Sequence, residues 1–299
     1  MIVSESKYVR FSVVIPLYNK EKHIAGTIKS VLEQFFRDFE IVVVNDGSTD
    51  DSLKVAKSIQ DSRIRIISKS NGGVSSARNR GIAEAKNEWI ALLDADDAWL
   101  PNHLENLAKA ISLFPEHKVF FTGFTRDVRP DYTPWCKNFA VPVENYFKLA
   151  NSGKVMFSSS SAFHASIAME MPMFREDLTR GEDIDLWTRL AKKYVPVLVG
   201  EVSAIYFHCA ENRATMRSRV LEKSMIWHVK ISQISDKDEK EYFRKQYYIV
   251  LDSVLFTRNF WQILRRQKYY GFFRFWLWLF NKNLSRLLRF LSRRVRNRK

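Results

Sequence analysis

Three carboxylates end an apolar segment of the chain in the sequence LLDADDAWL, residues 92–100. Asp94 and Asp96 are separated by one residue, so both can reach beyond a strand end and present hard oxygen ligands to one cation. Mg²⁺ and Mn²⁺ prefer such ligands when they also hold phosphate oxygens, so the pattern indicates chemistry on a phosphorylated substrate. Asp97 allows a second interpretation, because it also precedes a helical pattern and could cap that helix.

The elements that must position these carboxylates follow from hydrophobic periodicity. Residues 11–123 alternate apolar, β-branched runs with helical patterns, which predicts βαβ units and a mostly parallel sheet. Strands are expected over FSVVIPLYN, which breaks at Pro16, and over FEIVVVNDGS, RIRIISK and EWIALLDADD. Helices are expected over KEKHIAGTIKSVLEQ, DDSLKVAKSI and VSSARNRGIAEA. Loops that follow parallel strands meet at one sheet edge, where ligands bind, and residues 16–19, 45–48 and 94–97 are expected there.

The second half of the chain is less regular. Four prolines interrupt residues 124–180, which predicts loops and one or two short strands. GEDIDLWTRLAKKY predicts a helix, and PVLVG and SAIYFH predict two strands. From about residue 215 onward the pattern is helical and rich in aromatic residues.

The net charge of +15 is concentrated at the C-terminal end. Residues 253–299 hold 13 Lys and Arg and no Asp or Glu, which leaves +2 for the first 252 residues. Any partner inferred from charge therefore belongs to this tail. Its most apolar stretch, residues 269–280, has 12 residues including Arg274, whereas a membrane span needs about 20 apolar residues. We expect no span there.

The end of the tail has the pattern of an amphipathic helix. Its apolar stripe consists of Leu284, Leu287, Leu288, Leu291 and Val295, with arginines largely on other faces. Such a helix suits the surface of an anionic membrane. Two alternatives remain open: an aromatic helix packed on the α/β domain, and nucleic-acid binding by arginines interleaved with aromatic rings.

Five segments together resemble the family 2 inverting glycosyltransferases: VVIPLYN, VVNDGSTDDS, NGGVSSARNRG, LLDADD and GEDIDLWTRL, in this order and spacing. The resemblance covers roughly residues 11–210. It implies the GT-A fold, the α/β, Rossmann-like fold of nucleotide-diphospho-sugar transferases. It makes residues 1–214 the catalytic domain, with a nucleotide-binding half at about 11–123 and an acceptor-side half at about 124–214. Residues 215–299 form a helical, basic and aromatic extension that we expect to associate with a membrane.

The resemblance implies roles for residues of a donor site. Tyr18 resembles the aromatic residue that stacks on the nucleotide base, with Pro16 and Asn19 shaping its loop. Asp46 can accept a hydrogen bond from a uracil imide N–H, which favours uridine, and its alternative is an Asx-turn. Arg78, one turn into its expected helix, could face the base or the diphosphate.

The carboxylate cluster completes the implied donor site. Asp94 and Ala95 are expected to bind the donor nucleotide, with Asp94 holding the ribose or a metal-bound water. Asp96 is the expected ligand of Mn²⁺ or Mg²⁺, which would neutralise the leaving nucleoside diphosphate. His208, at the end of an apolar run, is a candidate further metal ligand; its alternative is a structural strand-end histidine.

Inversion by direct displacement requires a base on the acceptor hydroxyl. The pair Glu182-Asp183 matches the family's ED motif at a helix start, where backbone N–H groups and the helix dipole favour an ionised carboxylate. Asp183 is therefore the expected base, and an ordinary acidic first turn is the alternative. Trp187, on the same helix, could flank a sugar or lie in the core.

The sequence thus predicts a metal-dependent inverting transferase that moves a sugar from a nucleotide sugar, with UDP expected, to a hydroxyl of a lipid-linked or cell-surface glycan. We expect it on the cytoplasmic face of the membrane, because the chain has two cysteines and its N-terminus lacks the pattern of a secretory signal. One alternative is an enzyme like the processive polysaccharide synthases, although their QxxRW motif reads QILRR at residues 262–266. A nucleic-acid-binding protein that uses the tail is the other.

Overall fold

The computed structural model describes residues 9–127, 130–207 and 221–253. The chain divides into two compact units, Met1–Ser218 and Arg219–Lys299. The first unit carries the segments that the sequence relates to a donor site. In the second unit, the described helices are α8 (Met225–His228) and α9 (Lys237–Ser253), with two short 3₁₀ turns, Leu221–Lys223 and Ile231–Gln233.

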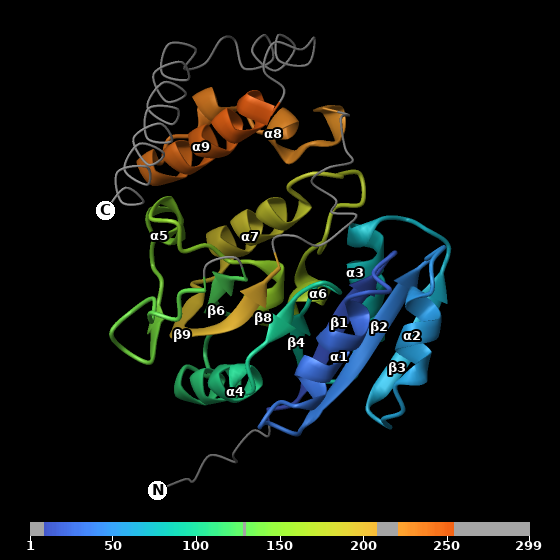
Figure 1. Ribbon diagram of the computed structural model, residues 1–299. Helices are drawn as coiled ribbons and strands as arrows, with labels where there is room; N and C mark the ends of the chain where they lie inside the picture. Colours follow the sequence, from blue (N-terminus) through green and yellow to red (C-terminus); the bar gives the residue numbers. More distant parts are fainter. Residues whose placement is uncertain (1–8, 128–129, 208–220, 254–299) are drawn as a thin grey trace, which may run out of the picture. The chain divides into compact units, whose positions relative to one another are not determined.

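A nine-stranded sheet forms the centre of the described part of the first unit, in the order β3-β2-β1-β4-β8-β6-β9-β5, with β7 paired to β9. Four adjacent strands are parallel to one another: β3 (Ile64–Lys69), β2 (Phe39–Asp46), β1 (Phe11–Leu17) and β4 (Trp89–Leu92). The other strands form the mixed part of the sheet: β8 (Ser161–His164), β6 (Val119–Arg126), β9 (Val197–Tyr206), β5 (Ala98–Trp99) and β7 (Ala140–Pro142). Figure 1 shows the parallel strands at one end of the sheet and β6, β8 and β9 at the other.

Seven helices connect these strands within the ranges described. Three of them follow the first three strands in a βαβ alternation: α1 (Ile24–Leu32), α2 (Ser52–Ser58) and α3 (Val74–Glu84). The others are α4 (His103–Leu113), α5 (Tyr146–Asn151), α6 (Ile167–Glu170) and α7 (Glu182–Lys193). The predicted α/β class and the parallel arrangement of the first half are confirmed.

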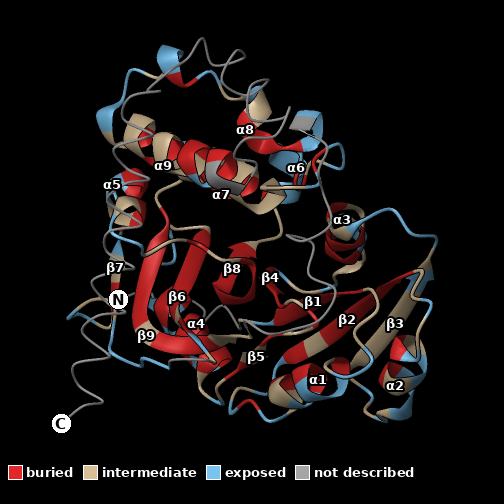
Figure 2. Cartoon of the chain, turned by 45° about the horizontal axis from the view of Figure 1, so that its top comes forward, coloured by how far each residue is buried: buried red, intermediate tan, exposed pale blue. Residues whose placement is uncertain are grey.

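Both faces of the parallel strands are covered, which explains why β1 is buried at every position. Side chains of a strand alternate between faces. Val13 and Ile15 share a core with Ile24 and Ile28 of α1. Val14, on the opposite face, meets α3, and buried residues run along β1 and β2 in Figure 2. Two helical layers therefore pack against the strands whose ends carry the segments that the sequence relates to a donor site.

Two strand predictions are wrong in detail. Pro16 does not end β1, which continues to Leu17. Pairing with β4 stops at Val14, so Pro16 lies where β1 has only β2 as a partner and a missing N–H is tolerated. The segments PVLVG and SAIYFH form the single strand β9, because a bulge opposite Gly123 absorbs the irregular stretch between them.

The described ranges contain no helix with the length and apolar character that a bilayer crossing requires. The tail beyond Ser253 lies outside the described residues, and so do its apolar stretch and its arginine-rich end. Its proposed contacts with membrane or nucleic acid therefore stay predictions.

Gly81 allows α3 to approach the sheet closely. A Cβ atom at this position would lie only 2.3 Å from Cγ1 of Val14 and 3.2 Å from Cγ2 of Val44. Gly81→Ala should therefore lower the free energy of unfolding by about 1–3 kcal/mol, because overpacking displaces the helix. The matched control is Gly26→Ala on the exposed face of α1, where an added Cβ atom would have no neighbour within 4 Å. The helix preference of Ala should raise stability there by up to about 1 kcal/mol. Equal effects in urea denaturation would contradict this account of α3.

Candidate active site

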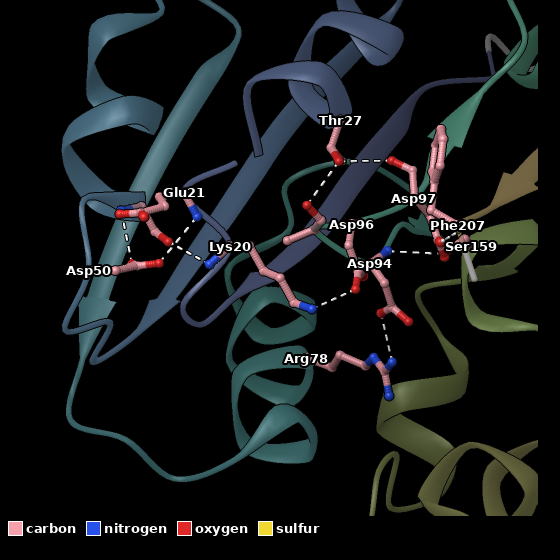
Figure 3. Close-up of polar contacts among 12 residues, drawn as sticks. Lys20, Glu21, Thr27, Asp50, Arg78, Asp94, Asp96, Asp97, Ser159 and Phe207 are labelled. Carbon is pink, nitrogen blue, oxygen red and sulfur yellow. Dashed lines mark hydrogen bonds and ion pairs between the residues drawn. The ribbon is translucent and has the colours of Figure 1, made fainter. Parts of the chain in front are cut away.

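A residue of α1, Thr27, holds the loop after β4 in place. Oγ1 of Thr27 lies 3.0 Å from the carbonyl oxygen of Ala95 and 2.8 Å from that of Asp97, so its proton is shared between them. The side chain of Ala95 is buried in the core, so this residue can contribute to a site in the loop through its backbone alone. The N–H of Asp97 donates to the carbonyl of Asp94 at 3.0 Å, which closes a tight turn. The three carboxylates therefore diverge from one rigid turn (Figure 3).

Asp97 points into the protein and connects three segments. Its Oδ2 accepts a hydrogen bond from Oγ of Ser159 at 2.5 Å, and its Oδ1 accepts from the N–H of Phe207 at 3.1 Å. Ser159 Oγ in turn accepts from the N–H of Asp94 at 3.1 Å. Burial, together with the charge of Asp94, raises the pKa of Asp97 well above its ordinary value. Asp97 is thus a structural anchor; it does not cap α4, whose N-cap is Asn102.

Arg78 joins the two carboxylate segments of the site. Its guanidinium donates to Oδ1 of Asp94 at 2.7 Å and to Oε1 of Glu182 at 3.2 Å. It also lies over the ring of Phe174, 4.9 Å from the centroid, and is 4% exposed. Burial acts against its charge, but Asp94 and Glu182 more than offset this and raise the pKa of Arg78. The predicted contact of Arg78 with a base or diphosphate stays a prediction; in this structure it bridges carboxylates.

Glu182 and Asp183 begin α7 after Gly181, whose φ of 75° lies in the left-handed region that favours glycine. Oδ1 of Asp183 accepts a hydrogen bond from the N–H of Ile184 at 2.8 Å. Burial raises the pKa of Asp183, whereas the Arg78 guanidinium and this N–H group lower it. Burial likewise raises the pKa of Glu182 to about 7, with the charge of Asp183 adding to the effect. Burial therefore raises the pKa of both carboxyls above their ordinary values.

Trp187 lies one turn further along α7 and belongs to the core. It is 1% exposed and contacts the ring of Phe174 edge-on, with centroids 6.4 Å apart. The core alternative for Trp187 is therefore the one that the structure supports.

Asp96 already holds a cationic side chain. Its Oδ2 lies 2.6 Å from Nζ of Lys20, which follows β1 (Figure 3). Among the residues that the structure describes, no three His, Cys, Asp or Glu side chains gather closely enough to hold a metal ion by themselves. Mg²⁺ is commonly bound through one or two carboxylates together with substrate phosphates and waters. Asp96 suits such a site, because its carboxylate oxygen Oδ2 already has a positively charged partner, the Lys20 ammonium. His208, the candidate second ligand, lies outside the described residues.

Asp46, at the end of β2, organises the loop that opens α3. Its Oδ1 accepts from Nζ of Lys69 at 2.7 Å and from the N–H of Gly72 at 2.9 Å. Its Oδ2 accepts from the N–H of Gly73 at 2.8 Å, and its backbone carbonyl accepts from Asn71. The carboxylate is therefore a loop clamp, and Oδ2 has one hydrogen-bond partner within this network.

The loop after β1 is clamped to the loop after β2. Asn19 adopts φ of 51°, a left-handed conformation that Asn tolerates. Its Oδ1 accepts from the N–H of Thr49 at 2.8 Å, and its own N–H donates to Oγ of Ser48 at 3.2 Å. Pro16 is buried in β1, and Tyr18 is partly exposed between the strand and this clamp. The predicted loop-shaping residues thus lie at the expected edge of the sheet.

Three residues near these positions escaped the sequence prediction: Lys20, Lys69 and Ser159. The bridging role of Glu182 was missed as well. Lys20 and Lys69 each neutralise a carboxylate on a neighbouring strand end. Ser159 lies in the run SSSS with no local sign of its role. Only a lysine next to each polar strand end could have suggested the first two.

Asp97→Ala tests the anchoring role. It removes the acceptor of the buried Ser159 hydroxyl and of the Phe207 N–H, so we expect the free energy of unfolding to fall by about 2–3 kcal/mol. Asp51→Ala, at an exposed N-cap that makes no side-chain cap hydrogen bond, is the matched control and should change stability by less than about 0.5 kcal/mol. Asp97→Ala with wild-type stability in chemical denaturation would show that Asp97 does not anchor the loop.

Glu182 predicts a pH dependence of stability. Because its folded pKa of about 7 exceeds its ordinary value of 4.5, the folded protein binds more protons than the unfolded one between these values. This group therefore lowers the free energy of unfolding as pH rises through that window, by on the order of 1–3 kcal/mol. Glu182→Gln should remove the contribution of Glu182 to the decline, whereas Glu105→Gln, at an exposed position in the first turn of α4, should preserve it. Parallel curves for Glu182→Gln and wild type between pH 4.5 and 7.5 would refute the assignment.

Comparisons with known proteins agree with the fold. The family model described as glycosyl transferase family 2 matches residues 12–174, more than half of the chain. A glycosyltransferase of Rickettsia conorii is 32% identical over 262 residues, which cover 83% of this chain and 42% of that protein. The glycosyltransferase GlyG of Streptococcus pneumoniae is 38% identical over 103 residues, which cover 33% of this chain and 34% of that protein. The chain spans less than half of the length of these two relatives.

Solved structures show the same architecture. TarS residues 1–349 of Staphylococcus aureus, in complex with UDP-GlcNAc, aligns with a TM-score of 0.62 at 18% identity. The alignment covers 87% of this chain and 71% of that one. The likeness establishes the fold and confirms the predicted GT-A architecture. Because the family model matches more than half of the chain, including Asp46, Arg78 and Asp94 to Asp97, the chain belongs to glycosyl transferase family 2.

Proposed function

We propose that this protein transfers a sugar from a nucleotide sugar, with UDP as the nucleotide, to an acceptor hydroxyl with inversion at the anomeric carbon. The observation that carries the proposal is the Arg78 bridge between Asp94 and Glu182. It joins the loop of the proposed donor site to the helix of the proposed base, as a single displacement requires.

The proposed nucleotide site lies at the carboxyl ends of β1 and β2. Tyr18 supplies a ring for stacking on the base. Oδ2 of Asp46 keeps acceptor capacity, because a carboxylate oxygen has two lone pairs and Gly73 is its one partner in the loop network. A uracil imide N–H is a donor that suits this oxygen. The TarS complex with UDP-GlcNAc supports a UDP-linked donor, since that protein has the same fold.

Asp96 is the proposed ligand for Mn²⁺ or Mg²⁺, with His208 as a candidate second ligand. When bound, the cation would neutralise charge that develops on the leaving diphosphate. The chain itself supplies a rigid support for this oxygen, because Thr27 fixes the carbonyls on both sides of Asp96. A fixed carboxylate needs no reorganisation when it receives a cation.

Asp183 is the proposed base. Its carboxylate oxygen Oδ1 already has the Ile184 N–H as a partner, and the other oxygen would receive the proton of the acceptor hydroxyl. Burial raises the pKa of this carboxyl and Arg78 lowers it, and a general base is most effective when its pKa lies near the working pH.

For the acceptor we propose a hydroxyl of a lipid-linked or cell-surface glycan, reached at the cytoplasmic face of the membrane. The support for this is the basic and aromatic composition of residues 253–299, which suits an anionic lipid surface.

Transfer and donor binding together test the proposal. UDP-sugars are screened with Mn²⁺ for binding by calorimetry and for hydrolysis or transfer by product analysis. Asp183→Asn should bind the donor as wild type does and lose transfer by about a hundredfold or more, because general-base catalysis is removed. Asp96→Ala should lose the metal-dependent part of donor binding.

The matched control for the base is Asp185→Asn on the same helix. Asp185 pairs with Arg189 at 2.8 Å, so its neutralisation should leave transfer within a few-fold of wild type. Full transfer by Asp183→Asn would exclude Asp183 as the base, and the absence of any nucleotide-sugar binding by wild type would reject the donor assignment.

A further inference from the structure

The ion pair between Lys20 and Asp96 occupies the carboxylate to which the proposed divalent cation would bind. Nζ of Lys20 lies 2.6 Å from Oδ2 of Asp96, and the two side chains are only 11% and 18% exposed. Charges this close and this shielded from water interact much more strongly than an exposed pair. The ammonium is therefore a resident counter-ion of Asp96.

The backbones on both sides of the pair are fixed. The N–H of Lys20 donates to Oγ of Ser52 at 2.6 Å, and its carbonyl accepts from the N–H groups of His23 and Ile24 at 3.0 Å. The loop of Asp96 is held by the Thr27 hydroxyl. A change of partner at Asp96 would therefore involve motion of the lysine side chain, while the backbones on both sides stay in place.

The neighbouring cation cannot make the same exchange. Arg78 is buried and divided between Asp94 and Glu182, so its departure would leave two carboxylates without their partner. Lys20 lies on the loop between Asn19 and α1, beside the clamp that joins the β1 and β2 loops. From there an ammonium on a four-carbon chain can turn from Asp96 toward a diphosphate held at the same sheet edge.

We propose that Lys20 and the divalent cation are alternative occupants of Asp96, and that a nucleoside diphosphate drives the exchange by giving the Lys20 ammonium a new partner. The inference rests on the proposed function and deepens it, because it assigns Lys20 as a diphosphate-binding residue. An ammonium and a divalent cation repel each other at one carboxylate oxygen, so each lowers the affinity of the other for it.

The exchange makes cation and nucleotide binding mutually dependent. Without nucleotide, the cation must displace Lys20 and binds weakly. With nucleotide, phosphate oxygens serve both the cation and the ammonium, so both bind more tightly. By linkage, the factor by which UDP increases Mn²⁺ affinity equals the factor by which Mn²⁺ increases UDP affinity.

Calorimetric titration of Mn²⁺ into the full chain, with and without saturating UDP, measures this factor. Lys20→Met removes the competitor, so Mn²⁺ affinity without UDP should rise by about tenfold or more, and the coupling factor should fall correspondingly. Lys20→Arg keeps a cation at this position and should retain the weak Mn²⁺ binding of wild type. The matched control is Lys29→Met, since Lys29 lies on the exposed face of α1 with its Nζ 3.6 Å from Glu33. Its Mn²⁺ affinity and coupling factor should match those of wild type. Thermal melts confirm that each variant is folded, and Lys20→Gln replaces Lys20→Met if the latter is not.

The inference is overturned if Mn²⁺ affinity in the absence of UDP is unchanged or weaker in Lys20→Met and Lys20→Gln, or if no variant binds Mn²⁺ with or without UDP. Asp96→Asn should abolish the gain, which assigns the bound Mn²⁺ to this carboxylate. Failure of the proposed function has a different signature, since wild type would then bind no UDP-sugar under any condition while the Mn²⁺ titrations without UDP still report on Lys20.

Discussion

The candidate site depends on one buried charge, the guanidinium of Arg78. It lies at the meeting point of α3, the loop after β4 and the start of α7, and it pairs with Asp94 and Glu182. Removing one partner of a buried ion pair costs about 3–5 kcal/mol, because the remaining charge stays away from water. The three segments are therefore held in one arrangement, although they come from distant parts of the sequence.

Three carboxylates within four residues would repel one another strongly if they shared one environment. The structure gives each a different solution. Asp94 is neutralised by Arg78, Asp96 by Lys20, and Asp97 is turned inward, where burial raises its pKa and Ser159 and Phe207 donate to it. Only Asp96 has a partner on a flexible chain. This difference, which the spacing of the motif does not reveal, separates a carboxylate suited to exchange of cations from two that hold the loop.

Much of the fold could be predicted because its signals are local. Periodicity placed β1 to β4 and α1 to α3, since a period of two or of 3.6 appears within a few residues. The misses have non-local causes. Pro16 is tolerated because β4 has already ended beside β1, and β9 is continuous because β6 carries Gly123 opposite its bulge. The residues proposed for the donor site came from motifs, whereas Lys20 and Ser159 were missed because their partners lie on other elements and no pattern in the chain indicates them.

The ionisation of Asp183 shows how such distant contacts could serve chemistry. Burial at the start of α7 raises the pKa of this carboxyl, and the guanidinium of Arg78, in α3, lowers it. A general base is most effective when its pKa lies near the working pH, so the balance of these two opposing effects bears directly on the proposed role of Asp183. Because Asp94 shares the same guanidinium, a ligand that changes the charge around Asp94 also changes the field at Asp183. If the proposed donor binds at Asp94, its binding would therefore change the basicity of Asp183 through one arginine.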